Sequence, residues 1–269
     1  MKKSILATFF CLAAYFTLLG QNNTDYLSVA SMNIGGARAN LSGVDALFGN
    51  QAGLANIEGF VASVNAIQRF SLSDLNRFSG GLAFPFAKGA LGLSVVNVGN
   101  DALREQNVGV FYARKLHKYL SISAQFNWLS YSIDGFGNTN NYTVEIGAQS
   151  EINKYLSLGV HIYSPGELEF TENQPIPSVF ESGIAYRPNP KLEMYASIRK
   201  VIEQSVEVIF GLDYIIHERL ALQAGGNTTL SEFTGGLQVK ANDSFTLLFG
   251  VAYHNTLGRS PGMGFQYEK

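Results

Sequence analysis

The side chains best suited to chemistry in this chain are four histidines and one nearby serine. The histidines are His117, His161, His217 and His254, and Ser164 follows His161 by three positions. A serine beside a histidine suits acyl transfer, because the imidazole accepts the proton of the attacking hydroxyl. No nucleophile motif surrounds Ser164, and a histidine that lines a lumen or a membrane boundary needs no such partner. We therefore expect the protein not to be an enzyme and to have no catalytic residue.

Metal, phosphate and nucleic-acid chemistry lack their usual patterns. The sequence has no His-x-x-x-His pair and no cysteine cluster. The glycines of Gly135–Asn138 suggest a phosphate loop, but no Lys-Ser/Thr pair or helix signal follows them. A formal net charge of -2 provides no basic field for a polyphosphate. We expect no cofactor, no metal and no nucleic-acid partner.

The first twenty residues have the order of a secretory signal. Two lysines are followed by the apolar stretch Ile5–Leu19, then by Gly20 and a polar run, which predicts a signal peptide over residues 1–20. The single cysteine, Cys11, lies inside this signal, so the mature chain should have no thiol chemistry. No later segment approaches the roughly 18 apolar residues of a membrane helix. An exported chain of this kind is either a soluble periplasmic protein or an outer-membrane barrel.

The rest of the chain alternates apolar and polar residues, which favours strands with one face toward lipid and the other toward a lumen. In one segment Leu120, Ile122, Ala124, Phe126 and Trp128 share a face, while Ser121, Ser123, Gln125 and Asn127 share the other. The sequence predicts an all-β fold, a transmembrane antiparallel β-barrel of about 14 strands over residues 60–269. The predicted strands are Phe60–Phe70, Arg77–Phe86, Ala90–Val98, Asn107–Leu116, Tyr119–Ile133, Tyr142–Ile152, Tyr155–Ser164, Val179–Arg187, Leu192–Val201, Val206–Ile216, Arg219–Asn227, Glu232–Ala241, Ser244–His254 and Gly258–Tyr267.

Short turns and longer loops alternate between these strands, as in barrels with tight periplasmic turns and larger outer loops. The short connections are 87–89, 117–118, 153–154, 188–191, 217–218 and 242–243, and the longer ones are 72–76, 99–106, 134–141, 165–178, 202–205, 228–231 and 255–257. We expect the protein to lie in the outer membrane, in contact with its lipid, with both termini facing the periplasm. A soluble β-sandwich or propeller also alternates, but it does not require this ordering of connections.

Aromatic residues near the strand ends predict girdles at the two membrane boundaries. Tyr119 and Tyr155 stand near the short turns, and Tyr131, Tyr142 and Tyr163 stand near the longer loops. An amphipathic ring at each boundary would hold the barrel at a fixed depth in the bilayer.

Residues 21–59 lack alternation and are rich in small residues, with one possible helical turn at Asp45–Phe48. A barrel of this width has a lumen that its own side chains do not fill, so we expect this segment to fold inside it as a plug. The candidate plug motif is Asp45, Asn50, Gln51, Ala52 and Gly53.

Together with Gly36-Ala37 and Ala39, this motif resembles the small-residue segment of the FadL-like outer-membrane proteins, and within them the PorV/PorQ group of type IX secretion. That segment ends in an Asn-Pro-Ala-Gly-Leu signature, and here Gln51 stands in place of the proline. The resemblance implies a fourteen-stranded barrel with an N-terminal plug. It also implies one of two functions, which are the passage of hydrophobic molecules such as fatty acids and partnership in protein secretion or surface attachment.

The sequence favours the second function, a non-enzymatic subunit of an outer-membrane protein-secretion or protein-assembly complex with other outer-membrane proteins as partners. Short loops leave little room for a ligand pocket, and the predicted lumen is charged. Its predicted inward residues include Glu145, Glu151, His161, Glu193, Arg199, Glu207, Asp213, Arg219 and Lys240. The alternative is a FadL-like diffusion channel for hydrophobic small molecules, in which Asn50 and Gln51 border the route of a hydrophobic ligand or lipid.

The longest loop, residues 165–178, combines acidic residues with one aromatic residue and restraining prolines. This composition suits a contact with a partner protein, although an ordinary solvated loop has a similar one. The candidate contact residues are Glu167, Leu168, Phe170, Pro175 and Pro177.

Overall fold

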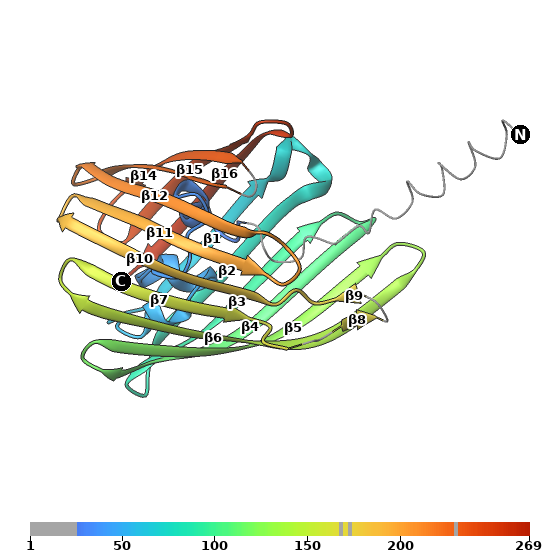
Figure 1. The fold of residues 1–269 in the computed structure, drawn as a ribbon, viewed down its shortest axis with the longest axis horizontal. Helices are drawn as coiled ribbons and strands as arrows, with labels where there is room; N and C mark the ends of the chain where they lie inside the picture. Colours follow the sequence, from blue (N-terminus) through green and yellow to red (C-terminus); the bar gives the residue numbers. More distant parts are fainter. Residues whose placement is uncertain (1–25, 167–168, 172–173, 229–230) are drawn as a thin grey trace, which may run out of the picture.

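The computed structural model describes residues 26–166, 169–171, 174–228 and 231–269, without the side chains of residues 169–171 and 174–175. The predicted signal peptide lies outside the described residues, as do Glu167, Leu168 and the side chains of Phe170 and Pro175. Fourteen strands form one closed antiparallel barrel, in which β1 pairs with both β2 and β16 (Figure 1). The predicted fold class is confirmed.

All fourteen predicted strands are present in the barrel. They are β1 (Val61–Gln68), β2 (Asn76–Phe86), β3 (Gly89–Gly99), β4 (Leu103–His117), β5 (Leu120–Ile133), β6 (Gly137–Asn153), β7 (Leu156–Tyr163), β10 (Val179–Asn189), β11 (Leu192–Val201), β12 (Val206–His217), β13 (Leu220–Asn227), β14 (Glu232–Lys240), β15 (Phe245–His254) and β16 (Gly258–Glu268). The strands β8 (Glu169–Thr171) and β9 (Gln174–Pro175) form a separate small hairpin in the loop after β7, which the sequence analysis did not predict.

The barrel has two different ends, which we call the short-turn end and the long-loop end. The short-turn end holds the connections 87–88, 118–119, 154–155, 190–191, 218–219 and 241–244, and the long-loop end holds the others. The turn between β2 and β3 has a positive φ at both central residues, Ala87 (44°) and Lys88 (66°). This is the mirror-image geometry that matches the twist of a two-residue hairpin.

Two predicted loops are wrong in extent. The segments 99–106 and 134–141 are mostly strand, because β4 begins at Leu103 and β6 begins at Gly137, which leaves connections of three residues each. Both segments are largely polar, so the sequence has no apolar alternation that would indicate a strand there. They pair in register nonetheless, since a strand that continues past the bilayer into water needs no apolar face.

The exterior of the barrel is apolar and its interior is polar or small. On β5, Ile122 and Phe126 are exposed, whereas Ser123, Gln125 and Asn127 between and beside them are buried. Large apolar side chains are exposed on every strand of the barrel wall. Such a continuous apolar surface is stable in lipid and would aggregate in water, so the fold is that of a membrane barrel.

The predicted girdles are correct at some positions and wrong at others. Tyr119, Tyr155 and Tyr142 are 44–56% exposed on the outer wall. Tyr163 is instead 6% exposed, because it shares the inward face of β7 with His161. Tyr131 likewise shares the inward parity of β5 and is only partly exposed. The period-two pattern therefore decides orientation even for a tyrosine at a strand end.

Residues 26–59 run inside the barrel, and we call this segment the plug (Figure 1). Its helical elements are α2 (Val29–Asn33), η1 (Gly43–Phe48) and η2 (Gln51–Leu54), and the connection between β1 and β2 holds η3 (Arg69–Ser71) and η4 (Ser73–Leu75). Within the described residues, no helix has the length and apolar character needed to cross a membrane. The predicted helical turn at Asp45–Phe48 forms the greater part of η1.

The plugged lumen as the candidate functional site

The plug crosses the lumen from one end of the barrel to the other. Tyr26 lies at the long-loop end, where its hydroxyl donates to Glu232 at the start of β14 (2.5 Å) and accepts from Asn227 at the end of β13 (3.1 Å). The plug reaches the short-turn end at Gly59, beside Lys269. Tyr26 and Lys269 therefore lie at opposite ends of the barrel. The location of both termini in the periplasm stays a prediction, because residues 1–25 lie outside the described range.

On one part of the wall, the plug rests directly against glycines, through its backbone at Ile34 and Gly35 and through its side chains at Met32 and Asn33. Five neighbouring strands, β12 to β16, each present an inward glycine to Met32–Gly35, and we call this surface the glycine recess. It consists of Gly211, Gly225, Gly236, Gly250 and Gly262. A Cβ at Gly225 would lie 2.3 Å from the Gly35 nitrogen, and one at Gly250 would lie 1.8 Å from the Asn33 side-chain oxygen. No larger side chain fits without displacing the plug.

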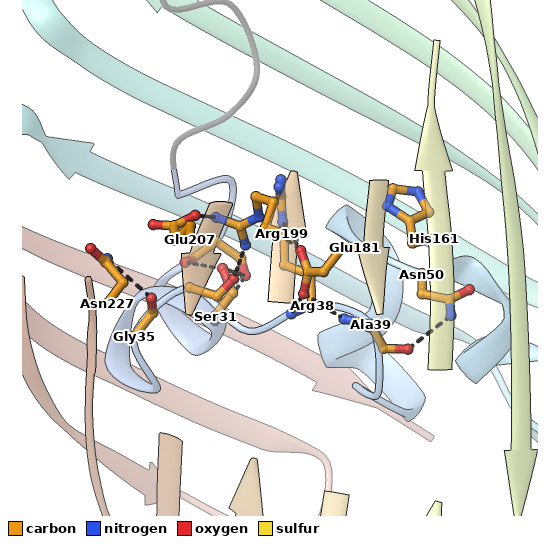
Figure 2. A network of polar contacts seen from close by, with 12 residues as sticks. Ser31, Gly35, Arg38, Ala39, Asn50, His161, Glu181, Arg199, Glu207 and Asn227 are labelled. Atoms are coloured by element: carbon orange, nitrogen blue, oxygen red, sulfur yellow. Dashed lines mark hydrogen bonds and ion pairs between the residues drawn. The ribbon is translucent and has the colours of Figure 1, made fainter. Parts of the chain in front are cut away.

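On the adjoining part of the wall, formed by β10 to β12, buried charges connect the plug to the barrel. The Glu181 carboxylate on β10 accepts hydrogen bonds from the backbone N–H groups of Arg38 (2.8 Å) and Ala39 (3.0 Å) in the plug. It also accepts from Arg199 Nε on β11 at 2.9 Å, and Arg199 Nη1 reaches Glu207 on β12 at 2.9 Å (Figure 2). We call Arg38, Glu181, Arg199 and Glu207 the ionic latch. All four are at most 7% exposed.

Asn50 joins the plug to itself and to the wall. Its Nδ2 group donates to the Ala39 carbonyl (2.8 Å), and also to the carbonyls of Ala148 on β6 (2.9 Å) and Val160 on β7 (3.2 Å). Its side-chain oxygen accepts from the Ala52 N–H at 3.2 Å, which caps η2. Asn50 is fully buried, so its side-chain amide and carbonyl groups would otherwise be unsatisfied polar atoms.

The other motif residues have smaller roles in the packing. Gln51 and Ala52 are buried in η2, and a Cβ at Gly53 would lie 2.1 Å from the Leu41 carbonyl oxygen. Gln266 Nε2 on β16 donates to Asp45 Oδ1 at 2.5 Å. Burial raises the pKa of the Asp45 carboxyl to about 6, and the hydrogen bond from Gln266 acts in the opposite direction. The structure thus gives the positions of all five motif residues, and any functional role for them is a proposal.

A second charged cluster closes the lumen beside Tyr26. Arg69 Nη2 donates to Glu232 at 2.9 Å, and the Arg69 guanidinium lies 5.0 Å from the centre of the Tyr26 ring. Arg69 stands in η3, outside the strand ladder, and folds back into the barrel mouth. This contact connects the first loop, the plug and the β13–β14 edge of the mouth.

His161, which was considered for catalysis, is part of a buried hydrogen-bond network. His161 Nε2 lies 2.9 Å from Glu145 Oε2, and the amides of Gln125 and Asn127 donate to Glu145 Oε1 at 3.0 and 2.9 Å. This arrangement satisfies a buried carboxylate and presents no nucleophile to the imidazole. Among the described residues, no group of three or more His, Cys, Asp or Glu is placed to hold a metal ion.

The predicted lumen charges are correct in the middle of the barrel and less so at its rim. Glu145, His161, Arg199 and Glu207 are buried, whereas Glu151, Arg219 and Lys240 are exposed at the short-turn end, where the lumen opens. Glu193 and Asp213 are partly exposed there.

The sequence analysis missed Glu181, although the sequence carried a signal for it. Phe180, Ile184 and Tyr186 mark the lipid face of β10, and this parity places Glu181 inward. It also missed Arg38 and Arg69. No periodic pattern covers the plug or the first loop, so nothing local indicated their direction.

No protein-family model and no curated protein matches the sequence. Solved structures do match over most of the chain. A structure described as the CymD monoaromatic hydrocarbon channel superposes with a TM-score of 0.70 at 12% identity, over 90% of this chain and 97% of that one. The Ralstonia pickettii toluene transporter TbuX gives 0.65 at 12% identity, over 92% and 99%.

A FadL homologue from Pseudomonas aeruginosa gives a TM-score of 0.61 at 11% identity, over 91% of this chain and 97% of that one. These similar proteins are channels or relatives of channels rather than enzymes. Identities this low carry the fold and leave the substrate open. The chain therefore has the fold of the FadL-like outer-membrane barrels.

Proposed function

We propose that this chain is an outer-membrane channel for small hydrophobic molecules. The observation that carries the proposal is its likeness in fold to hydrocarbon channels along nearly the whole length of both chains. The narrower assignment to a PorV/PorQ-like secretion partner has no such support among the similar structures, so the diffusion channel becomes the main proposal.

The lumen has an apolar layer that suits this function. Leu129, Tyr163, Val179 and Val201 are buried inward residues that pack together near the long-loop end, and Ile176 from the loop after β7 covers them. Each wall residue lies two positions beyond a polar one, as Tyr163 lies beyond His161, which corresponds to about 7 Å along a strand. The apolar layer lies nearer the long-loop end than the ionic latch, so an apolar solute that enters beside β5, β7, β10 and β11 reaches this layer before the latch.

Below this layer the described conformation is closed. The ionic latch and the plug fill the lumen. An apolar solute placed among these buried charges would separate them from their polar partners, which is unfavourable. Solute in the apolar layer would replace Ile176 there, and onward passage requires the plug or the wall to rearrange.

Uptake of radiolabelled toluene by cells with and without the barrel tests the proposal. We expect faster uptake with the barrel, and we expect Val201→Asp to remove the gain because it places a charge in the apolar layer. Glu203→Gln, at an exposed site in the same β11–β12 connection, should leave uptake unchanged. Equal uptake with and without the folded barrel would overturn the proposal.

A secretion or assembly subunit remains a second candidate, favoured by one specific observation. The β5–β6 hairpin extends at the long-loop end, and Phe136 at its tip is 90% exposed. A large aromatic side chain held in water is typical of a protein-contact surface. Affinity purification from gently solubilised outer membranes should recover a larger complex if this candidate is correct and a lone barrel if it is not.

A further inference from the structure

Basic residues gather at the short-turn end of the barrel. Of the 19 lysines and arginines, ten lie there, namely Lys88, Arg114, Lys115, Lys118, Lys154, Arg187, Lys191, Arg219, Lys240 and Lys269. Among the described residues, the long-loop end has five, namely Arg69, Arg77, Arg104, Lys200 and Arg259, of which Arg69 and Arg77 are buried. The two ends therefore present different electrostatic potentials to the two compartments.

Two hollows of similar size open at the short-turn end. The first, about 520 Å³, is bounded by the turns β6–β7, β10–β11 and β12–β13 and by the end of β14. The second, about 460 Å³, lies between the end of the plug and the ends of β4, β5 and β6. We call them the first and the second hollow.

The hollows differ in charge. The first is lined by five basic side chains, Lys154, Arg187, Lys191, Arg219 and Lys240, against three acidic ones, Glu193, Asp213 and Glu218. The second is lined by three basic side chains, Lys115, Lys118 and Lys269, against four acidic ones, Glu58, Glu151, Asp243 and Glu268. Of the two hollows, the first therefore has an excess of positive charge and the second does not.

Part of the basic lining has no internal partner. Arg187 pairs with Glu193 at 2.6 Å, and the Asp213 carboxylate accepts from Gln223 at 2.6 Å. Within the described part of the chain, Lys191, Arg219 and Lys240 form no ion pair with a carboxylate.

The spacing of these cations selects the kind of ligand. Each comes from a different turn or strand end, and successive turns lie two strands apart, about 10 Å at the usual strand separation. A single phosphate does not span that distance, whereas acidic side chains two or four residues apart share one face of an extended peptide and lie about 7 to 14 Å apart. A lipid headgroup would approach from the bilayer and meet outward residues such as Tyr186 and Tyr214 instead of the inner wall.

We propose that the first hollow binds an acidic peptide segment of a protein partner in the compartment that the short turns face. The predicted orientation makes that compartment the periplasm. The site is independent of the proposed transport function, because it lies beyond the plug and shares no residue with the apolar layer. Its charge suits recognition and fast association more than high affinity, since exposed ion pairs are individually weak.

The proposal is tested on the purified full-length mature barrel in detergent, by fluorescence anisotropy of a labelled hexaglutamate peptide. The wild type should bind it and should not bind labelled hexalysine. The variant Lys191→Glu/Arg219→Glu/Lys240→Glu should raise the Kd about tenfold or more, because three attractions become repulsions.

The control variant Lys88→Glu/Lys115→Glu/Lys118→Glu changes the net charge by the same amount at the same end but outside the first hollow. It should bind hexaglutamate nearly as the wild type does. Equal losses of affinity in the two triple variants would mean that hexaglutamate responds only to the net charge of this end, which would overturn the proposal. The absence of binding by the wild type would also overturn it. Displacement of the peptide by inorganic phosphate at equal concentration would instead indicate a small-anion site and contradict it. Toluene uptake should be the same in all three proteins, so this test stands whatever the outcome of the transport experiment.

Discussion

The plug meets the barrel wall in two different ways on two neighbouring parts of the wall. Against β12–β16 it fits the glycine recess, where the backbone of Ile34 and Gly35 and the side chains of Met32 and Asn33 lie so close to the wall glycines that no Cβ fits between them. Against β10–β12 the ionic latch holds it through carboxylate and guanidinium groups removed from water. The recess therefore determines the position of the plug by shape. The latch holds the plug only when all of its charged side chains are present.

The two surfaces differ in how they fail. A buried ion pair contributes little net stability compared with well-packed apolar groups, but removing one partner leaves an uncompensated charge and is costly. A close-packed surface tolerates small losses and resists additions. Substitutions that remove side-chain atoms should therefore destabilise the protein most at the latch. Substitutions that add atoms should destabilise it most at the recess.

Loss of the latch carboxylate should have the largest effect. Glu181→Ala leaves Arg38 and Arg199 buried with less negative charge and leaves two plug N–H groups without their acceptor. We expect a loss of about 3–5 kcal/mol in the free energy of unfolding. It can be measured from urea unfolding of the barrel in lipid vesicles.

Glu203→Gln is the matched control, because Glu203 is an exposed carboxylate at the long-loop end. It should change the free energy of unfolding by less than about 0.5 kcal/mol. If Glu181→Ala were as mild as this control, the latch would not hold the plug.

Addition of one methyl group to the recess should have the next largest effect. In Gly225→Ala the new Cβ would lie 2.3 Å from backbone atoms of Ile34 and Gly35 and 2.7 Å from the Phe210 carbonyl oxygen, none of which belongs to a flexible side chain. We expect a cost of about 2–3 kcal/mol, seen as a lower temperature for the shift between folded and unfolded bands in gel electrophoresis. Gly235→Ala has 3.8 Å to its nearest neighbour and should leave that temperature nearly unchanged.

The barrel wall and the plug contacts differ in how well the sequence predicts them. Period-two alternation is local, so all fourteen strands and the apolar exterior could be predicted. Each strand from β12 to β16 also has an inward glycine that the sequence shows. Alternation placed Arg199 and Glu207 of the latch in the lumen, but their connection to the plug could not be predicted, because Arg38 and Glu181 are 143 positions apart and only the closed barrel brings them together. The β8–β9 hairpin and the inward turn of Arg69 depend on loop geometry that no periodic pattern records.

The Asn50 side chain holds the plug against β6 and β7, outside both surfaces, and its loss should have an intermediate effect. Asn50→Ala removes the η2 cap and the donor to three carbonyl groups in the plug, β6 and β7. The expected cost is about 1–3 kcal/mol, the range for leaving buried backbone groups unsatisfied. Asn50→Asp keeps the cap acceptor but not the donor, so it should be no better than alanine by urea unfolding. A full rescue by aspartate would mean that only the cap matters.

The smallest effect should come from restoring the proline of the FadL-like signature. Gln51 is the first residue of η2, where an N–H has no intrahelical acceptor and the fixed φ of proline is compatible with the helix. Asn50 before it is already extended, as a residue before proline prefers. Gln51→Pro should therefore change the free energy of unfolding by less than about 1 kcal/mol in either direction. The companion Ala52→Pro removes the N–H that Asn50 caps and should cost more. A large loss in Gln51→Pro alone would mean that the glutamine side chain, and not the backbone of the turn, seats this part of the plug.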